Sequence, residues 1–353
     1  MEPIQLGPLR LFPFGLITAF LLLPFFVWAA HLMRKNDLKR ETASWFALLA
    51  VPFSLILSRL GFCLLILDRL TGLRDPGFFF RFGEGGFLLW GAVAGALLAA
   101  AVAGKITKQS GAAIADSVIA PFCLLISAIR LLCGLLFRDI GVGLSLEDWF
   151  APEVTDYAYR FSLFRLENYS FFERFPFAVQ DYYGSWCWAV FVLQALWAGC
   201  IPLFLRQPHA APGGRTVLFV ILYAAGTMVT ESMLVGGHIL SLPWQSFIKA
   251  NELLSAVILA AVLPVCIRRI PAGQRLRAAA PAFLCFLSAI GVVILMEFAA
   301  YDKRISWIEW LPADACHVLT ALACLAVILS FRSLWEKAYA PSAPEKNNLG
   351  EKP

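Results

Sequence analysis

Three charged residues lie inside long apolar runs of this sequence: Arg59, Arg130 and Glu231. The runs that contain them are 43–67, 114–137 and 216–235. A charged side chain is costly inside a bilayer, so each of the three is a candidate for a functional site. The arginine guanidinium pairs bidentately with phosphate, and a positioned carboxylate can accept a proton. Together, these residue types suit a polar cavity for an anionic headgroup, open to the outer leaflet of the membrane.

The composition indicates that these runs cross a membrane. Of the 353 residues, 60% are hydrophobic, and the mean hydropathy is +0.73, unlike a soluble domain. A helix needs about 20 apolar residues to cross a bilayer, and its backbone must be satisfied internally. The sequence therefore predicts an all-α, polytopic helical membrane protein of about nine transmembrane helices. The nine runs are 11–33, 43–67, 87–104, 114–137, 187–205, 216–235, 250–268, 281–299 and 312–331.

Basic residues follow the odd-numbered runs, which predicts the orientation of the chain. Arg34 and Lys35 follow the first run, for example, and Arg268 and Arg269 follow the seventh. Because positive loops stay in the cytoplasm, we expect the N-terminus outside and the C-terminus inside. This loop pattern accounts for the net charge of +5, so no nucleic-acid partner is expected.

In this topology the three charges share one level beneath the outer surface. They lie four to eight residues from the outer ends of their runs, which is about 6–12 Å along a helix. Gln194, within the fifth run, lies at a similar level. Two explanations without a functional site stay open. The arginine side chains could snorkel to the membrane interface, or Glu231 could form a structural ion pair with one of them.

The segments outside the runs suggest three parts. Residues 1–268 form one membrane domain, with an acidic, aromatic outer loop at 138–186 that forms either a small head on the membrane or an interfacial aromatic belt. Residues 269–335 hold two further helices, and 336–353 form a polar cytoplasmic tail. The four histidines are scattered and the nine cysteines contain no C-x-x-C pair, so no metal and no cofactor is expected.

Several segments resemble the bacterial prolipoprotein diacylglyceryl transferases over about residues 4–268. Leu6-Gly7-Pro8 with Phe14-Gly15-Leu16 resembles the opening I-G-P … Y-G-L of that family, and Ser58-Arg59-Leu60-Gly61-Phe62 resembles its A-R-L-G-Y. Gly85-Gly86-Phe87-Leu88-Leu89-Trp90-Gly91 resembles G-G-M-S-F-H-G-G. Arg130 and Gly141 fall on the arginine and the closing glycine of the family signature, and Glu231 on the glutamate of R-x-x-x-E.

The resemblance implies a reaction and its partners. Members move the diacylglyceryl group of phosphatidylglycerol onto the lipobox cysteine of a preprolipoprotein, at the bacterial plasma membrane. It implies that Arg59, Arg130 and Gly141 bind the phospholipid. A preprolipoprotein signal peptide would be the second substrate. Glu231 is the only membrane-embedded carboxylate among the retained motif positions, so we hypothesise that it serves as the catalytic base for the thiol proton.

The chain also departs from the family at positions that chemistry needs. Trp90 replaces the motif histidine, and Thr227 replaces a second arginine four residues before Glu231. Ile129, Cys133, Arg138 and Phe14 replace other motif residues. Three functions therefore stay open: a divergent transferase, a catalytically inactive relative that binds a phospholipid or lipoprotein, and a membrane transporter. Transfer of diacylglycerol distinguishes the first, lipid binding without turnover the second, and transport across sealed vesicles the third.

Overall fold

Nine long helices make up most of the described chain. The computed structural model describes residues 4–6, 9–11, 13–65, 76–80, 87–136, 176–180, 186–206, 210–233, 249–299, 308 and 310–339. The helices in these ranges are α1 (Pro13–Lys35), α2 (Arg40–Leu65), α4 (Leu89–Thr107), α5 (Gly111–Leu136), α6 (Val190–Phe204), α7 (Gly214–Ser232), α8 (Ala250–Arg269), α9 (Arg275–Glu297) and α10 (Ala313–Tyr339).

These helices fall on the nine predicted runs, which confirms the polytopic helical fold. Among the described residues, seven helices are long and apolar enough to cross a membrane; α6, at 15 residues, is shorter, and α7 is not among the seven. Most residues of α7 are buried by its neighbours rather than left to face lipid. Protein packing replaces lipid contact around this helix, so polar side chains such as Glu231 can be accommodated in it.

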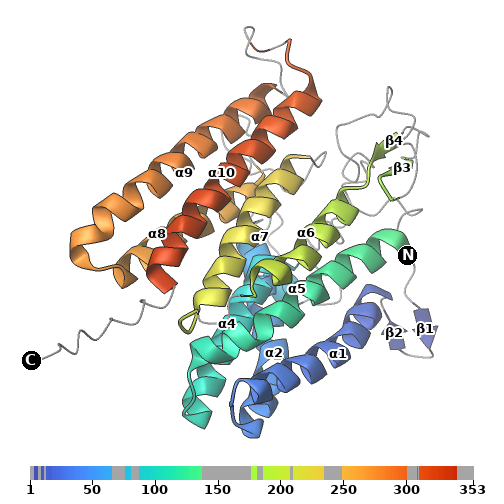
Figure 1. The fold of residues 1–353 in the computed structure, drawn as a ribbon. Helices are drawn as coiled ribbons and strands as arrows, with labels where there is room; N and C mark the ends of the chain where they lie inside the picture. Colours follow the sequence, from blue (N-terminus) through green and yellow to red (C-terminus); the bar gives the residue numbers. More distant parts are fainter. Residues whose placement is uncertain are drawn as a thin grey trace, which may run out of the picture.

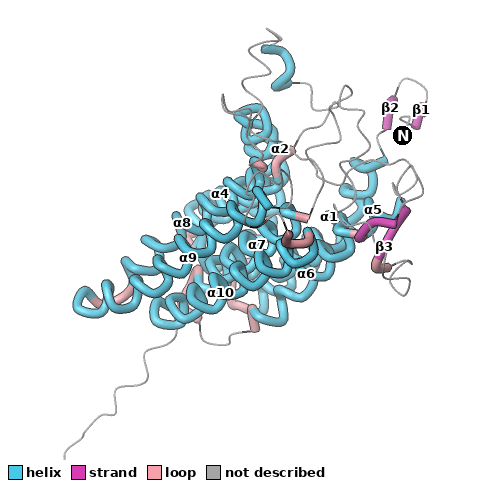
Figure 2. The backbone as a smooth tube through the Cα atoms, turned by 90° about the horizontal axis from the view of Figure 1, so that it is seen from above, coloured by secondary structure: helices cyan, strands magenta, loops and turns pink. Residues whose placement is uncertain are grey.

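Two short antiparallel hairpins accompany the helices. In the first, β1 (Ile4–Leu6) pairs with β2 (Leu9–Leu11), and in the second, β3 (Ala178–Gln180) pairs with β4 (Trp186–Trp188). Figure 2 shows the strands at one end of the helical body. Strand β3 falls in the predicted outer loop, whereas β4 begins at the last residue of that loop and continues into the predicted run 187–205. The described part of the loop therefore contains β structure.

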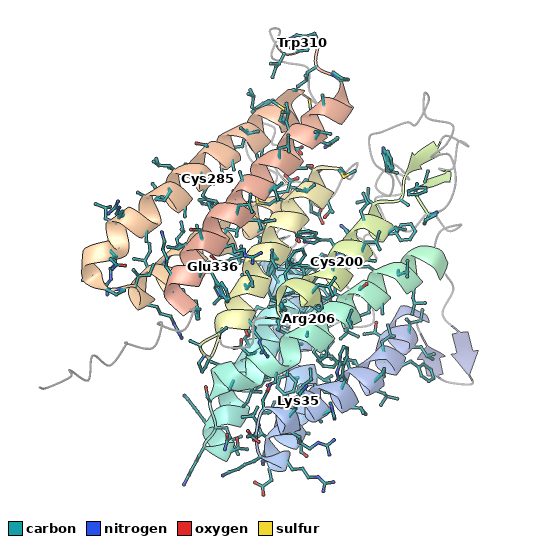
Figure 3. All side chains as sticks on the ribbon, in the orientation of Figure 1. Lys35, Cys200, Arg206, Cys285, Trp310 and Glu336 are labelled. Carbon is teal, nitrogen blue, oxygen red and sulfur yellow. The ribbon has the colours of Figure 1, made fainter. Side chains whose placement is uncertain are left out.

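The helices are joined by short connections at one end and long ones at the other. The short connections are 36–39, 108–110, 205–213 and 270–274. Basic residues gather at this end, where Figure 3 places Lys35, while Trp310 lies at the opposite end. We name the end with the long connections the outer end, following the predicted orientation. The N-termini of α4, α6, α8 and α10 meet the C-termini of α2, α5, α7 and α9 there.

Helix α7 is central to the bundle. It packs against α5 and α6 on one side and against α8 and α10 on the other, as Figure 1 shows. A large core joins α7 to α4–α6 and to the C-terminal helices, and a second core joins α1, α2, α4 and α5. Helices α9 and α10 therefore belong to the same packed body as the rest.

The last helix continues to Tyr339, beyond residue 335, where the polar tail was expected to begin. Trp335 Nε1 donates a hydrogen bond to the carbonyl oxygen of Gly214, 2.7 Å away, at the start of α7. The guanidinium carbon of Arg269 lies 4.3 Å from the centre of the Tyr339 ring. These aromatic contacts bury the last turn of α10, which explains why the helix does not end where the composition becomes polar.

Candidate functional site

Arg59 is enclosed by aromatic rings near the outer end of α2, with 0% of its surface exposed. Its Nε donates a hydrogen bond to the carbonyl oxygen of Phe79, 3.4 Å away, in the short 3-10 helix η1 (Pro76–Phe80). Its guanidinium carbon lies 5.9 Å from the ring centre of Phe62 and 6.0 Å from that of Phe87. An aromatic face attracts a cation at about this distance. Burial of the guanidinium argues against snorkelling to the interface.

Close packing of α4 on α2 holds this turn in place. A Cβ atom at Gly91 would overlap the backbone of Leu57 and Ser58, and one at Gly95 would overlap α2 one turn away. Glycine permits this approach because it has no side chain. Ser58 Oγ donates a hydrogen bond of 2.6 Å to the carbonyl oxygen of Leu88, and the Leu88 amide donates one of 3.1 Å to the backbone carbonyl oxygen of Ser58. The turn of α2 that carries the first arginine is thus fixed to the start of α4.

Arg130 lies near the outer end of α5 and is 8% exposed. Its side chain hydrogen-bonds Tyr223 of α7, the guanidinium donating toward the hydroxyl oxygen. The Tyr223 ring stacks on Phe219, with ring centres 5.4 Å apart, and meets the edge of Trp90 at 5.5 Å. Trp90, at the position of the family's histidine, therefore supports the residue that holds Arg130.

Glu231 lies two turns beyond Tyr223 on α7, on the same helix face, and is 3% exposed. Tyr223 interacts electrostatically with both Arg130 and Glu231. Gln194 of α6 donates from Nε2 to the hydroxyl of Thr230, 3.4 Å away. The structure therefore brings four of the predicted residues, Arg130, Glu231, Gln194 and Trp90, to one part of the bundle, around the outer half of α7.

The two arginines have separate surroundings. Arg59 contacts residues of α2, η1 and the segment before α4, whereas Arg130 contacts α7. The start of α4 touches both, because Phe87 lies against Arg59 and Trp90 lies against Tyr223. The surroundings of the two arginines are thus connected by the start of α4.

A second set of polar side chains is buried on the other side of Glu231. It consists of Lys249, Glu252, Glu297 and His317, each between 2% and 6% exposed, and we name it the buried cluster. Lys249 Nζ donates a hydrogen bond of 2.6 Å to the backbone carbonyl oxygen of Glu231. The end of α7 thus lies between Arg130 and the buried cluster.

Two further sequence predictions concern Gly141 and metal binding. Gly141 lies outside the described residues, as does most of the loop 138–186. Within the described chain, no group of three or more histidine, cysteine or acidic side chains is arranged to hold a metal ion.

Sequence reasoning singled out neither Tyr223 nor any of the four residues of the buried cluster. Glu252, Glu297 and His317 lie within predicted runs, so the rule that singled out Glu231 would also have found them. Tyr223 had no such signal, because tyrosine is common in membrane helices. Only its contacts with Arg130 and Trp90 distinguish it.

Comparison with known proteins identifies the family of the chain. A family model of prolipoprotein diacylglyceryl transferase matches residues 2–268, which include Arg59, Arg130, Tyr223 and Glu231. A search of curated proteins finds no match. Helices α9 and α10 lie beyond the matched residues. Since the match covers well over half of the sequence, the chain belongs to the prolipoprotein diacylglyceryl transferase family.

Proposed function

We propose that this protein transfers the diacylglyceryl group of phosphatidylglycerol to the lipobox cysteine of a preprolipoprotein, in the bacterial plasma membrane. Membership of the family supports the reaction class. The observation that carries the proposal is the link from Arg130 through Tyr223 toward Glu231, buried at the outer end of the bundle. It pairs an anion-binding group with a proton acceptor, and the reaction needs both.

Arg130 is the group that we assign to the phosphate. Its guanidinium can bind two phosphate oxygens at once, while the Tyr223 hydroxyl keeps it oriented. Arg59 adds positive charge nearby, on the other side of the start of α4. Burial from water strengthens the attraction between these charges and the phosphate. Entry of the lipid from the outer leaflet would bring its headgroup to this level.

The reaction then balances with residues of this chain alone. The cysteine sulfur attacks the glycerol carbon bonded to the phosphate oxygen, so an S–C bond forms and a C–O bond breaks. The electron pair leaves with the phosphate oxygen as glycerol-1-phosphate, whose added negative charge Arg130 offsets. The thiol proton passes to the Glu231 carboxylate, because a thiolate attacks far better than a thiol. No cofactor takes part.

Trp90 supports one rival function. An indole cannot accept the thiol proton, and this one packs against Tyr223 as part of the core. A relative that binds phosphatidylglycerol or a lipoprotein precursor without turnover would keep Arg130 and dispense with the histidine. Catalysis and binding therefore have to be measured separately.

The test is an assay of diacylglycerol transfer from labelled phosphatidylglycerol to a lipobox-cysteine peptide, run with the purified protein. We expect transfer by the wild type and its loss in Arg130→Ala. The matched control is Arg206→Ala, which removes an exposed arginine at the opposite end of the bundle and should leave transfer intact. Absence of transfer by the wild type, together with Arg130-dependent binding of phosphatidylglycerol, would replace the proposal with the binding function.

A further inference from the structure

The buried cluster joins two helices outside the family match to the end of α7. Lys249 and Glu252 lie at the start of α8, Glu297 ends α9, and His317 lies in the second turn of α10. Figure 1 shows α9 and α10 beside α7 and α8 at this end. The two C-terminal helices thus add a carboxyl and an imidazole next to the candidate site.

Two contacts connect the buried cluster directly to the end of α7. The ammonium of Lys249 donates to the carbonyl oxygen of Glu231 at 2.6 Å. His317 Nδ1 lies 3.3 Å from the hydroxyl oxygen of Ser232, the next residue along the helix. Both contacts lie on buried atoms, so water does not screen them.

The carboxyls of the cluster are close enough to influence one another. Glu252 interacts electrostatically with Glu297, Lys249 and Glu231. Among the described residues, Glu252 Oε1 and Glu297 Oε2 are buried and accept no hydrogen bond. In a purely structural ion-pair network these oxygens would be satisfied, because leaving a buried acceptor without a hydrogen-bond partner is unfavourable. Carboxyl oxygens kept available at the end of α7, in one buried cluster with an imidazole, are suited to exchanging protons.

We propose that the buried cluster exchanges a proton with the carboxyl of Glu231, so that Glu297 and His317 supply acid–base capacity which position 90 lacks. The inference rests on the proposed function, in which the exchanged proton is the one that the cysteine thiol releases. Glu231 takes the proton from sulfur, and the cluster receives it from Glu231 and restores the carboxylate. Glu297 and His317 then do not touch the substrate; they act through Glu231.

Several other groups face the cluster and bear on its protonation. Besides Lys249, they are the thiol of Cys316, which interacts with Glu297, and the thiol of Cys324, which interacts with Glu252. Tyr223 interacts with Glu231 from within α7. Of these, Lys249 carries the opposite charge to the carboxyls. The variants below therefore leave Lys249 unchanged.

The test compares kcat, KM and the pH–rate profile of His317→Asn and Glu297→Gln with those of the wild type. The asparagine amide can keep the contact of His317 Nδ1 with Ser232 but does not titrate. Loss of a general base typically slows catalysis by about 100-fold or more. We expect a fall in kcat of about that size with KM for phosphatidylglycerol unchanged, and a shift of the pH–rate profile. The control is Thr320→Val, a buried polar position one turn along α10, which should behave as wild type.

Wild-type kcat and pH profile in both variants would overturn the inference, as would an equal loss in Thr320→Val, which would indicate a structural role. A second measurement separates this inference from the proposed function. We expect the infrared carboxyl band of wild-type protein to titrate at a pH that moves in both variants. If the wild type transfers nothing, the proposed function fails, and the infrared titration still decides whether the cluster shares its proton: unmoved midpoints would refute it.

Discussion

Tyr223 hydrogen-bonds the cation of the site and interacts electrostatically with its carboxylate. Its ring is held by Phe219 and Trp90, so the hydroxyl has little freedom and orients Arg130. A guanidinium that is held in place loses less entropy when a phosphate binds. At the scale of single residues, the site depends as much on this support as on its charges.

Replacing Tyr223 with phenylalanine removes that hydroxyl and keeps the ring. A hydrogen bond to a charged group contributes about 1.5–3 kcal/mol, so we expect kcat/KM for phosphatidylglycerol to fall by about 10- to 100-fold. The same transfer assay measures it. Tyr339→Phe, at the opposite end of the bundle, is the matched control and should have no effect on transfer. Equal rates in the wild type and Tyr223→Phe would contradict the role given to the hydroxyl.

Replacing Glu231 with glutamine keeps the shape of the side chain and removes its ability to take the thiol proton. We expect transfer to be lost while phosphatidylglycerol still binds, because the phosphate contacts belong to Arg130. The assay of transfer, paired with lipid retention on purification, separates the two effects. Glu336→Gln, an exposed carboxylate that pairs with Arg332, is the control. Full transferase activity in Glu231→Gln would sink this assignment.

The pair α2 and α4 shows how elements position the site. The glycines of α4 allow its backbone to pack directly on α2, the helix that carries Arg59. At the start of α4, Phe87 then contacts Arg59, and Trp90 contacts Tyr223 of α7. The first turn of α4 is therefore shared by the surroundings of both arginines. A displacement of this helix would change the two environments together.

Gly91→Ala should expose this dependence. The added Cβ meets backbone atoms of Leu57 and Ser58, which cannot move aside independently of α2. We expect a lower melting temperature in detergent, with a loss of about 1–3 kcal/mol of stability, and weaker phosphatidylglycerol binding. Gly291→Ala is the matched control, since a Cβ at that position in α9 meets nothing within 4 Å. Unchanged binding and stability in Gly91→Ala would show that the helices tolerate a wider separation.

At the scale of the whole molecule, α10 contacts the part of the chain that the family model matches at both of its ends. The buried cluster lies at the outer end, and Trp335 and Tyr339 contact the start of α7 and Arg269 at the other. Asp116 of α5 also accepts hydrogen bonds of 2.8 Å from the amides of Gly213 and Thr216 at the start of α7. The ends of α7 are thus held by three other helices.

Trp335→Phe tests the contact between the end of α10 and the start of α7. The substitution leaves the Gly214 carbonyl without the indole donor, and losing one partner of a buried hydrogen bond costs about 1–3 kcal/mol. We expect a lower melting temperature in detergent, with transfer by the folded protein retained because the site lies at the other end. Trp310→Phe, an exposed tryptophan at the outer end, serves as control. A melting temperature equal to that of wild type would show that α10 is held by its other contacts.

The sequence was sufficient for the helices because a membrane span is a local signal. The apolar runs 43–67 and 281–299, for instance, each predict one helix from their own residues alone. Whether Arg59 snorkels or is enclosed depends on what packs over it. The Phe79 carbonyl and the Phe87 ring, from two segments outside α2, contact it together with Phe62 of α2 itself. The buried cluster likewise forms only where four helices meet. Such arrangements are long-range, and one sequence read run by run does not contain them.

The placement of the short connections has a consequence for biosynthesis. Along the chain, α1 with α2, α4 with α5, α6 with α7, and α8 with α9 are each joined by a short turn at the inner end, so eight of the nine described helices can enter the membrane as hairpins. Helix α10 has no such partner among the described residues and is made after the other eight. Because α10 carries His317, the buried cluster is incomplete until this helix has been made. Until then, a nascent chain holds Arg130 and Glu231 but lacks the imidazole of the buried cluster.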